Sequence, residues 1–255
     1  MLYLLLNGEA IQKTIGIPED KYNNKILEFA SKYNIDVSCI SSPIICNSSN
    51  ELIYMVKKQF GIKPYLVIAT TNIGKKQEYK NALGEDDYIY LDIKEVDVEE
   101  TGKTYEENSM LKAEEISYTI GRPAIGDDSG LEINALDGFP GLYSARCAGE
   151  DATDDDKVSF ILEKMKDVED RSASFVCSVS YCDYVNNIRK TFTARCDGHI
   201  TREPRGVAKK NLQYDTIFFS LELGFTFAEV KEEVKAEVSH RGKAIKQLKE
   251  FLKGE

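Results

Sequence analysis

The sequence predicts an α/β fold with a mixed sheet. Apolar runs of strand length alternate with helical stretches over much of the chain, which is the pattern of βα units. The segment 172–200 instead reads as β-rich sequence without a helix inside it. Alternating units combined with a run of adjacent strands are typical of a mixed sheet.

The first 64 residues read as a small α/β unit. We expect strands at 2–6 and 35–40 and helices at about 19–33 and 50–60. The run from Gly61 to Pro64 then breaks the pattern, because a proline does not easily continue the preceding helix. We therefore divide the chain into an N-terminal extension, residues 1–64, whose role the sequence does not indicate, and a main domain, residues 65–255.

The main domain begins with alternating elements and ends in a helix. An apolar run at 65–69 predicts a strand, followed by a polar loop and a helix that ends at Leu83. The further expected elements are a strand at 88–93, a helix at 105–121, a short strand at 124–126, a helix at 154–165, strands within 172–200 and a helix at 239–252.

Composition excludes several classes of protein. The apolar opening at 2–6 is too short for a membrane span and lacks the marks of a signal peptide, so we expect a cytosolic protein with no membrane partner. Six cysteines without a CxxC pair and two histidines argue against a zinc cluster. A net charge of -10 argues against nucleic-acid binding, although a small polyanion can still bind in a local cationic pocket with a divalent cation.

Thr70, Asn72 and Lys75 lie where the first main-domain strand meets its helix. Backbone N–H groups at a helix N-terminus favour phosphate, and Lys75 adds a full positive charge. A capped helix after a strand is also common in α/β proteins without a phosphate site. Both interpretations stay open on this motif alone.

A second polar group precedes and opens the helix expected at 105–121. Thr104 and Glu107 fit a capping box, which is a structural role. Asn108 and Lys112 lie one turn apart on the same helical face, as a phosphate site requires. Glu100 lies just upstream in a loop, where a carboxylate is either a ligand or ordinary surface.

Asp127 and Asp128 follow the strand expected at 124–126. Two adjacent carboxylates resist joint ionisation unless a cation holds them, and Mg²⁺ with one or two protein carboxylates fits this pair. The following Ser129 and Gly130 make the segment typical of an Asx-turn as well. Near the C-terminus, Lys235 and the run 239–242 (SHRG) gather cations at a helix start, where a serine also serves as an N-cap.

Taken together, these motifs resemble the inosine triphosphate pyrophosphatase family. The resemblance covers residues 65–252 in unbroken order. The runs that carry it are ATTNIGK at 69–75, EETG at 99–102, ENSMLKA at 107–113, DDSGLE at 127–132, GFPGLYSAR at 138–146, GHI at 198–200 with PRG at 204–206, and SHRGKA at 239–244. The family hydrolyses ITP, dITP and XTP to the monophosphate and diphosphate, and the same activity is expected here.

The resemblance also implies an architecture and a set of site residues. It implies two lobes that flank a central cleft, a homodimer, and Mg²⁺ as the cofactor. Asp128 is expected to be metal ligand and proton acceptor, Glu100 the second metal ligand, and Asp127 a supporting catalytic residue. The expected substrate-binding residues are Thr70, Asn72, Lys75, Lys112 and Ser129, together with Tyr214, Asp215, Lys235, His240 and Arg241 near the base.

One stretch departs from the family pattern. Where the family usually has GFGYDP, this chain reads KNLQYDT at 210–216, with extra residues after Gly206. The metal and triphosphate end of the pattern is intact and the base end is altered. Two alternatives therefore stay open: the same hydrolysis of a pyrimidine or otherwise modified nucleoside triphosphate, and a nucleotide-binding regulatory module whose catalysis has decayed.

Overall fold

The computed structural model describes residues 3–6, 9–12, 31–32, 44–46, 49–93, 98–149, 151–209 and 212–253. These residues belong to two compact units, one of residues 1–64 with 249–255 and one of residues 65–248. Among the described residues, no helix has the length and apolar character needed to cross a membrane.

The N-terminal unit contains a small antiparallel sheet and a helix. The sheet has the order β2-β1-β3, formed by β1 (Tyr3–Leu6), β2 (Glu9–Gln12) and β3 (Ile44–Cys46). Helix α2 (Ser49–Gln59) buries Leu52 and Val56. The strand expected at 2–6 and the helix expected at 50–60 are thus confirmed. Apart from helical residues 31–32, the elements expected at 19–33 and 35–40 lie outside the described residues.

The larger unit is built on a mixed sheet, so the predicted fold class is confirmed. Within the described residues its order is β10-β9-β8-β7-β6-β4-β5, with β4 parallel to β5 and β6 and the remaining pairs antiparallel. The strands are β4 (Tyr65–Ala69), β5 (Ile89–Leu91), β6 (Ala124–Ile133), β7 (Ser172–Asp183), β8 (Ile188–Ile200), β9 (Phe218–Ser220) and β10 (Phe225–Thr226).

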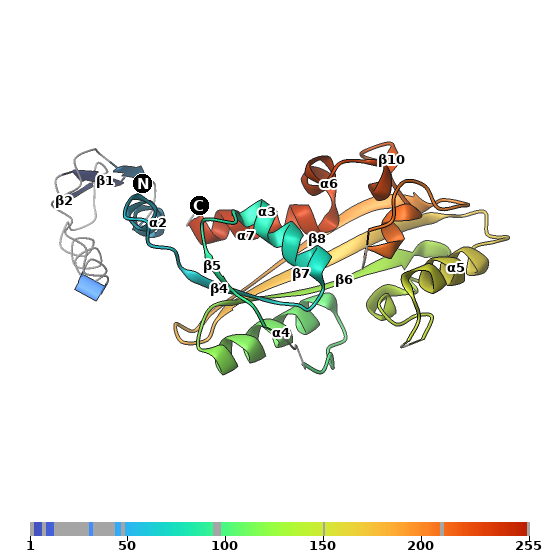
Figure 1. The fold of residues 1–255 in the computed structure, drawn as a ribbon, viewed down its shortest axis with the longest axis horizontal. Helices are drawn as coiled ribbons and strands as arrows, with labels where there is room; N and C mark the ends of the chain where they lie inside the picture. Colours follow the sequence, from blue (N-terminus) through green and yellow to red (C-terminus); the bar gives the residue numbers. More distant parts are fainter. Residues whose placement is uncertain are drawn as a thin grey trace. The chain divides into compact units, whose positions relative to one another are not determined.

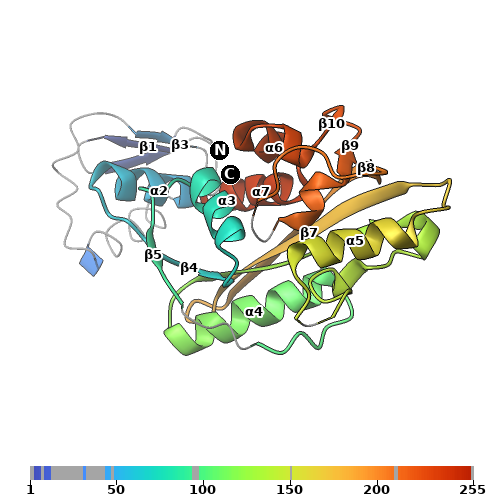
Figure 2. The same ribbon diagram turned by 45° about the vertical axis from the view of Figure 1, so that its right-hand side comes forward.

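Helices cover both faces of this sheet. Helix α4 lies on one face, and α3, α6 and α7 lie on the other (Figures 1 and 2). The helices are α3 (Ile73–Leu83), α4 (Tyr105–Ile120), α5 (Asp154–Lys164), α6 (Glu232–Val238) and α7 (His240–Lys253), with short 3₁₀ turns at η2 (Asn134–Leu136), η3 (Gly141–Tyr143), η4 (Gln213–Thr216) and η5 (Phe227–Glu229). Of these helices α6 was not expected from the sequence, nor were the short strands β9 and β10.

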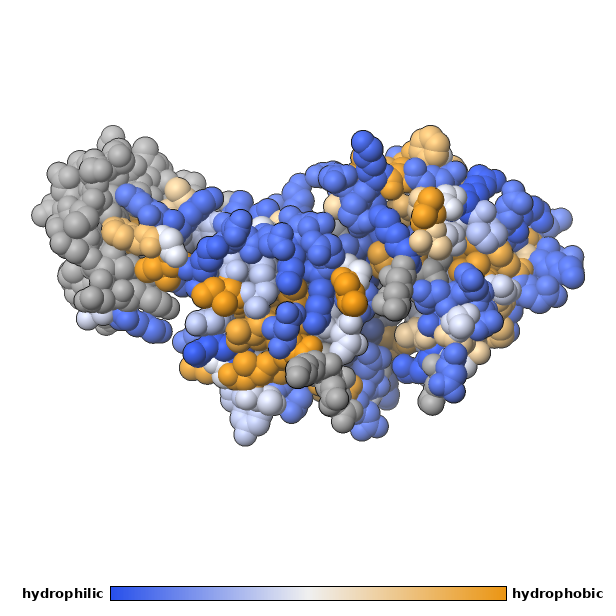
Figure 3. Space-filling view, in the orientation of Figure 1, coloured by the Kyte–Doolittle hydropathy of each residue, from blue (hydrophilic) through white to orange (hydrophobic). Residues whose placement is uncertain are grey.

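A large hydrophobic cluster lies where β6 and β8 end and β7 begins. Phe175 of β7 packs with Phe218 and Phe227, and α5 contributes Val158 and Ile161 to the same buried cluster. The molecular face in Figure 3 is mostly hydrophilic over residues 65–248, with smaller apolar patches.

Strand β6 corrects one expectation of the sequence. It was expected to end at Gly126, but it continues to Ile133 and pairs with β7 along its whole length. The Asx-turn that the sequence left open as an alternative at Asp127 and Asp128 does not form, because backbone pairing with β7 keeps this polar segment extended. Gly126 is needed where α4 crosses β6, since a Cβ there would lie 1.9 Å from the carbonyl oxygen of Ser109.

Candidate active site

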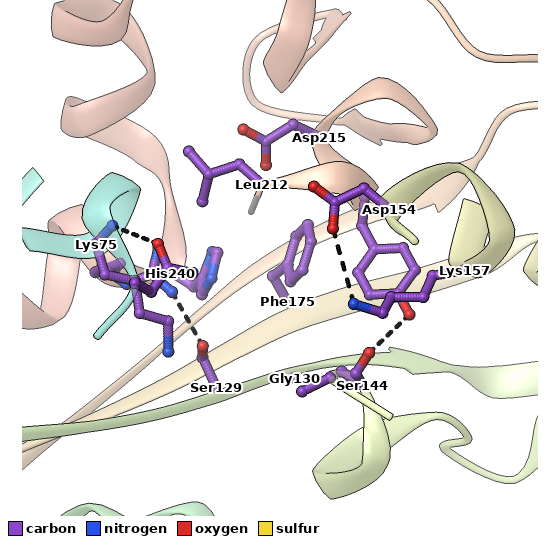
Figure 4. A pocket seen from close by; sticks show the side chains of 14 residues that line it. Lys75, Ser129, Gly130, Ser144, Asp154, Lys157, Phe175, Leu212, Asp215 and His240 are labelled. Atoms are coloured by element: carbon purple, nitrogen blue, oxygen red, sulfur yellow. Dashed lines mark hydrogen bonds and ion pairs between the residues drawn. The ribbon is translucent and has the colours of Figure 1, made fainter. Parts of the chain in front are cut away.

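A pocket of about 250 Å³ opens among α3, β6, β7, α5, η4 and α7. Seven of the residues expected from the sequence line it: Asn72, Lys75, Ser129, Tyr214, Asp215, His240 and Arg241. Figure 4 shows Lys75 and Ser129 toward one end, Asp154 and Lys157 toward the other, and Phe175 between them. We call these the Lys75 end and the Lys157 end of the pocket.

The N-terminus of α3 forms the Lys75 end. The side chain of Asn72 caps this helix by accepting a hydrogen bond of 3.0 Å from the backbone N–H of Lys75. Thr70 supports the cap, because its Oγ1 accepts a hydrogen bond of 3.2 Å from the N–H of Asn72. The capped turn holds Lys75 where the helix dipole also favours an anion.

Asp127 and Asp128 lie on opposite faces of the sheet, as successive residues of a strand do. Asp127 contacts side chains of α3 and α7, whereas Asp128 contacts Asn108 of α4. The expectation that these two neighbouring acids hold one cation between them is therefore wrong. The alternation gives each carboxylate separate partners.

Asp127 anchors the cations of the pocket. Its carboxylate forms an ion pair with Lys75 and accepts hydrogen bonds from Arg241 Nε at 2.9 Å and Tyr79 OH at 3.0 Å. Although burial alone would raise the pKa of Asp127, the charges of Lys75 and Arg241 hold it well below its usual range. Asp127 is therefore ionised and holds these cations in place, and it is a poor proton acceptor.

Asp128 belongs to a second cluster with Glu100, Asn108 and Lys112. Asn108 Nδ2 donates to Asp128 Oδ2 at 3.1 Å, and Lys112 Nζ lies 2.7 Å from Glu100 Oε1 and 3.9 Å from Asp128 Oδ1. Lys112 Nζ also donates to the backbone oxygen of Asp127 at 2.9 Å. The ammonium of Lys112 thus approaches the carboxylates of both Glu100 and Asp128, which the family resemblance implies as metal ligands.

The two carboxylates of this cluster differ in acidity. Burial raises the pKa of Asp128, Lys112 opposes this, and the negative charge of Glu100 raises the pKa further, so the net shift is upward. Burial would also raise the pKa of Glu100, but the hydrogen bond and charge of Lys112 lower it. Lys75 lowers the pKa of both groups, which links this cluster electrostatically to the Lys75 end. Asp128 is the better proton acceptor of the two.

A buried row of charges adjoins the pocket, whose lining includes two of its members, Asp215 and Arg241. Lys235 Nζ lies 2.7 Å from Asp215 Oδ2 and 2.8 Å from Glu78 Oε1, and Arg241 lies 2.5 Å from Glu78 Oε2. Burial would raise the pKa of Glu78, but Arg241 and Lys235 lower it to about 2. The row continues through Arg241 to Asp127. Lys235 is only 2% exposed and does not line the pocket. Its ammonium contacts the carboxylates of Glu78 and Asp215.

Sequence reasoning missed Glu78, although it lies one turn after Lys75 in α3. This i,i+3 spacing puts the two side chains on one helical face. Helical periodicity could therefore have placed Glu78 beside Lys75. It could not have indicated the buried partners Lys235 and Arg241, which are more than 150 residues away in the sequence.

Aromatic rings line the middle of the pocket. The His240 ring stacks on Phe175 with centroids 4.5 Å apart and an interplanar angle of 7°. Burial and the charge of Arg241 lower the pKa of His240 well below its usual value, so the ring is neutral. Tyr214 is buried, and its hydroxyl donates to the backbone oxygen of Ser144 at 2.8 Å. Leu212, from the altered stretch 210–216, also lines the pocket.

The structure brings together residues that the sequence did not single out. Besides Phe175 and Leu212, the pocket lining includes Gly130, Ser144, Ala145, Asp154 and Lys157. Of the expected site residues, the following lie outside the lining: Thr70, Glu100, Lys112, Asp127, Asp128 and Lys235. Each of these six touches another member of the set or a residue of the pocket wall.

Comparison with known proteins gives consistent matches. The sequence profile of the Ham1 family matches residues 66–251. The dITP/XTP pyrophosphatase of Staphylococcus epidermidis is 45% identical over 192 residues, which cover 74% of this chain and 97% of that protein. The protein of the same name from Desulfotalea psychrophila is 42% identical, over 73% of this chain and 84% of its own length.

Solved structures agree with these sequence matches. The Ham1 protein of Staphylococcus aureus superimposes with a TM-score of 0.66 at 39% identity, covering 74% of this chain and 98% of that one. The Ham1 protein of Coxiella burnetii gives a TM-score of 0.65 at 35% identity, covering 75% of this chain and 100% of that one.

Proposed function

This chain belongs to the Ham1 family, and from that membership and the pocket we infer that it is an enzyme, a pyrophosphatase of non-standard purine nucleoside triphosphates such as ITP, dITP and XTP. The products are the nucleoside monophosphate and diphosphate. Relatives at 37–45% identity carry the name dITP/XTP pyrophosphatase, which supports both the substrate class and the bond that is cleaved.

The observation that carries this proposal is the position of Glu100 and Asp128 around Lys112, within the electrostatic reach of Lys75. A polyphosphate needs cations to hold its charge and a basic group to activate water. Lys75, Lys112 and the N-terminus of α3 supply the first requirement. Asp128 supplies the second, because its raised pKa makes it the more basic carboxylate of the cluster.

The carboxylates of this cluster suit Mg²⁺. No group of three or more His, Cys, Asp or Glu side chains is arranged for a metal among the described residues, so a cage made only of protein ligands is not supported. Mg²⁺ is typically held by one or two carboxylates, waters and substrate phosphates, which matches Glu100 and Asp128. When bound, the ion neutralises phosphate charge and acidifies a coordinated water.

The residues of this chain then divide the remaining work. Asp128 takes a proton from the attacking water, and Asn108 orients its carboxylate through the 3.1 Å hydrogen bond. Lys75 and Lys112 stabilise charge on the diphosphate leaving group. Asp127 keeps Lys75 and Arg241 in position. In the middle of the pocket, Phe175, His240 and Tyr214 offer surfaces for the base.

A substrate with a different base remains the second candidate. The specific observation in its favour is Leu212, which lines the pocket in the stretch where the family resemblance expects an aromatic residue. A regulatory module with decayed catalysis is less well supported, because the carboxylates of Glu100 and Asp128 would repel a triphosphate that was only to be bound. The homodimer and the cytosolic location stay predictions of the sequence. We also propose residues 65–255 as the catalytic domain and residues 1–64 as an extension.

An assay of diphosphate release tests the proposal. ITP, XTP, dUTP and the four standard triphosphates are compared with Mg²⁺ and with EDTA. The expected result is rapid release from ITP and XTP only when Mg²⁺ is present. Equal release in EDTA would contradict the metal assignment, and preferential hydrolysis of dUTP would establish the second candidate instead.

A further inference from the structure

Lys157 occupies a fixed position at one end of the pocket. It lies in the first turn of α5, where a capping box between Thr153 and Asp156 sets the start of the helix. The same helix buries Val158 and Ile161 in the core. The side chain of Lys157 is 15% exposed and lines the pocket wall (Figure 4). A rigid element therefore presents this ammonium to whatever occupies the Lys157 end.

The cations of the pocket lining are not equally engaged. Arg241 donates to Asp127, Glu78 and Ser129, and Lys75 forms a close ion pair with Asp127. Lys157 Nζ lies 3.7 Å from Asp154 Oδ1, which is longer than a hydrogen bond. Among the described lining residues, Lys157 thus has the loosest carboxylate partner. Asp154 is within ion-pair distance of the ammonium of Lys157 but accepts no hydrogen bond from it.

The ends of the pocket suit different parts of a nucleotide. The Lys75 end has the helix N-terminus and lies within the electrostatic reach of the Glu100 and Asp128 cluster, so it suits the phosphates. A base beside the Phe175 and His240 rings would then extend toward Lys157. Lys157 is therefore placed to meet the edge of the base.

An ammonium recognises only the hydrogen-bond acceptors on the edge of a base. It donates three hydrogen bonds and accepts none, so it favours exocyclic oxygens and disfavours amino groups. Hypoxanthine carries one exocyclic oxygen, whereas xanthine carries two. The six-membered ring of xanthine in nucleotides also loses a proton near neutral pH, and the resulting anion attracts a cation. Of the bases that the pocket can hold, xanthine gains most from Lys157.

We propose that Lys157 is a specificity residue that favours xanthine over hypoxanthine by donating a hydrogen bond to the anionic xanthine ring. The proposal rests on the proposed function, since it takes the pocket to hold a purine nucleotide. It assigns the residue a task separate from hydrolysis, because the ammonium lies at the opposite end of the pocket from Lys75.

Substrate ratios test the proposal. The kcat/KM values for XTP and ITP are measured for the wild type, Lys157→Met, Lys157→Arg and a matched control, Lys166→Met, which removes an exposed lysine just after the same helix. We expect the XTP to ITP ratio to fall about tenfold or more in Lys157→Met, as for a lost hydrogen bond to a charged group. The ratio should be largely kept in Lys157→Arg and unchanged in Lys166→Met.

Binding of the products gives a second readout that does not need turnover. Calorimetry with XMP and IMP should show weaker binding of XMP alone in Lys157→Met, and Lys157→Gln replaces this variant if it does not fold. Equal losses for both nucleotides, or an unchanged ratio in an active enzyme, would overturn the role of Lys157 and leave the proposed function intact. A wild type that releases no diphosphate and binds neither nucleotide would refute both.

Discussion

Replacing Glu78 with glutamine tests the buried row of charges. Glu78 lies between Lys235 and Arg241, whose exposed fractions are 2% and 4%. Glutamine keeps the shape of the side chain but removes its negative charge. Lys235 then retains only Asp215, and Arg241 retains Asp127 as its carboxylate partner.

The expected loss of stability follows from this burial. Removing one partner of a buried ion pair costs roughly 3–5 kcal/mol, and the lower end applies because each cation keeps another carboxylate. A chain of this size loses roughly 2–4 °C of Tm per kcal/mol, so about 3 kcal/mol corresponds to a fall of roughly 6–12 °C.

The pH dependence of the same variant has a defined sign. The pKa of Glu78 falls from 4.5 to about 2 on folding, so the stabilisation is complete above 4.5 and is lost as the pH drops toward 2. The difference in unfolding free energy between wild type and Glu78→Gln should therefore be constant near neutral pH and shrink over that acidic range.

Circular dichroism during heating provides the measurement. The matched control is Glu163→Gln, which neutralises an exposed carboxylate 3.6 Å from Lys166 and should leave the Tm almost unchanged. If the Tm falls no further in Glu78→Gln than in this control, the ion pairs of Glu78 with Lys235 and Arg241 do not stabilise the fold.

Two further predictions concern the reaction. Asp128→Asn should lower kcat by ~10² or more with an unchanged circular dichroism spectrum, because it removes the proposed proton acceptor while nearly preserving shape; turnover near the wild-type value at saturating Mg²⁺ would contradict this role. Leu212 stands where the family resemblance expects an aromatic ring, so the wild type should prefer ITP to ATP but still hydrolyse triphosphates of other bases detectably. Leu212→Phe should raise the ratio of kcat/KM for ITP to kcat/KM for ATP. A ratio that does not change would show that Leu212 does not contact the base.

Local patterns predicted much of the fold. The helices at 73–83 and 105–120 begin at polar caps that are visible in the sequence, Asn72 and Thr104. Strand β6 escaped prediction beyond Gly126 because its polar residues imitate a turn. They stay extended because β7 pairs with them across the whole strand, a long-range effect that local sequence does not encode.

The candidate site was predictable in part for a similar reason. Motif order identified most residues of the Lys75 end. The position of Asp127 and Asp128 next to each other in the sequence suggested one pair of acids. Side chains alternate between the two faces of a strand, so Asp127 and Asp128 have different partners. Asp127 holds cations and has a lowered pKa, whereas the pKa of Asp128 is raised. Phe175 and Lys157 carry no motif of their own, and only the packing of β7 and α5 brings them to the pocket.

Identification of the products tests most directly whether this enzyme is a pyrophosphatase. XTP or ITP is incubated with the enzyme and Mg²⁺ to partial turnover, and the nucleotides and phosphates are separated by chromatography. We predict nucleoside monophosphate and diphosphate in equal amounts from the first time point. Nucleoside diphosphate with free orthophosphate as the first products would contradict it.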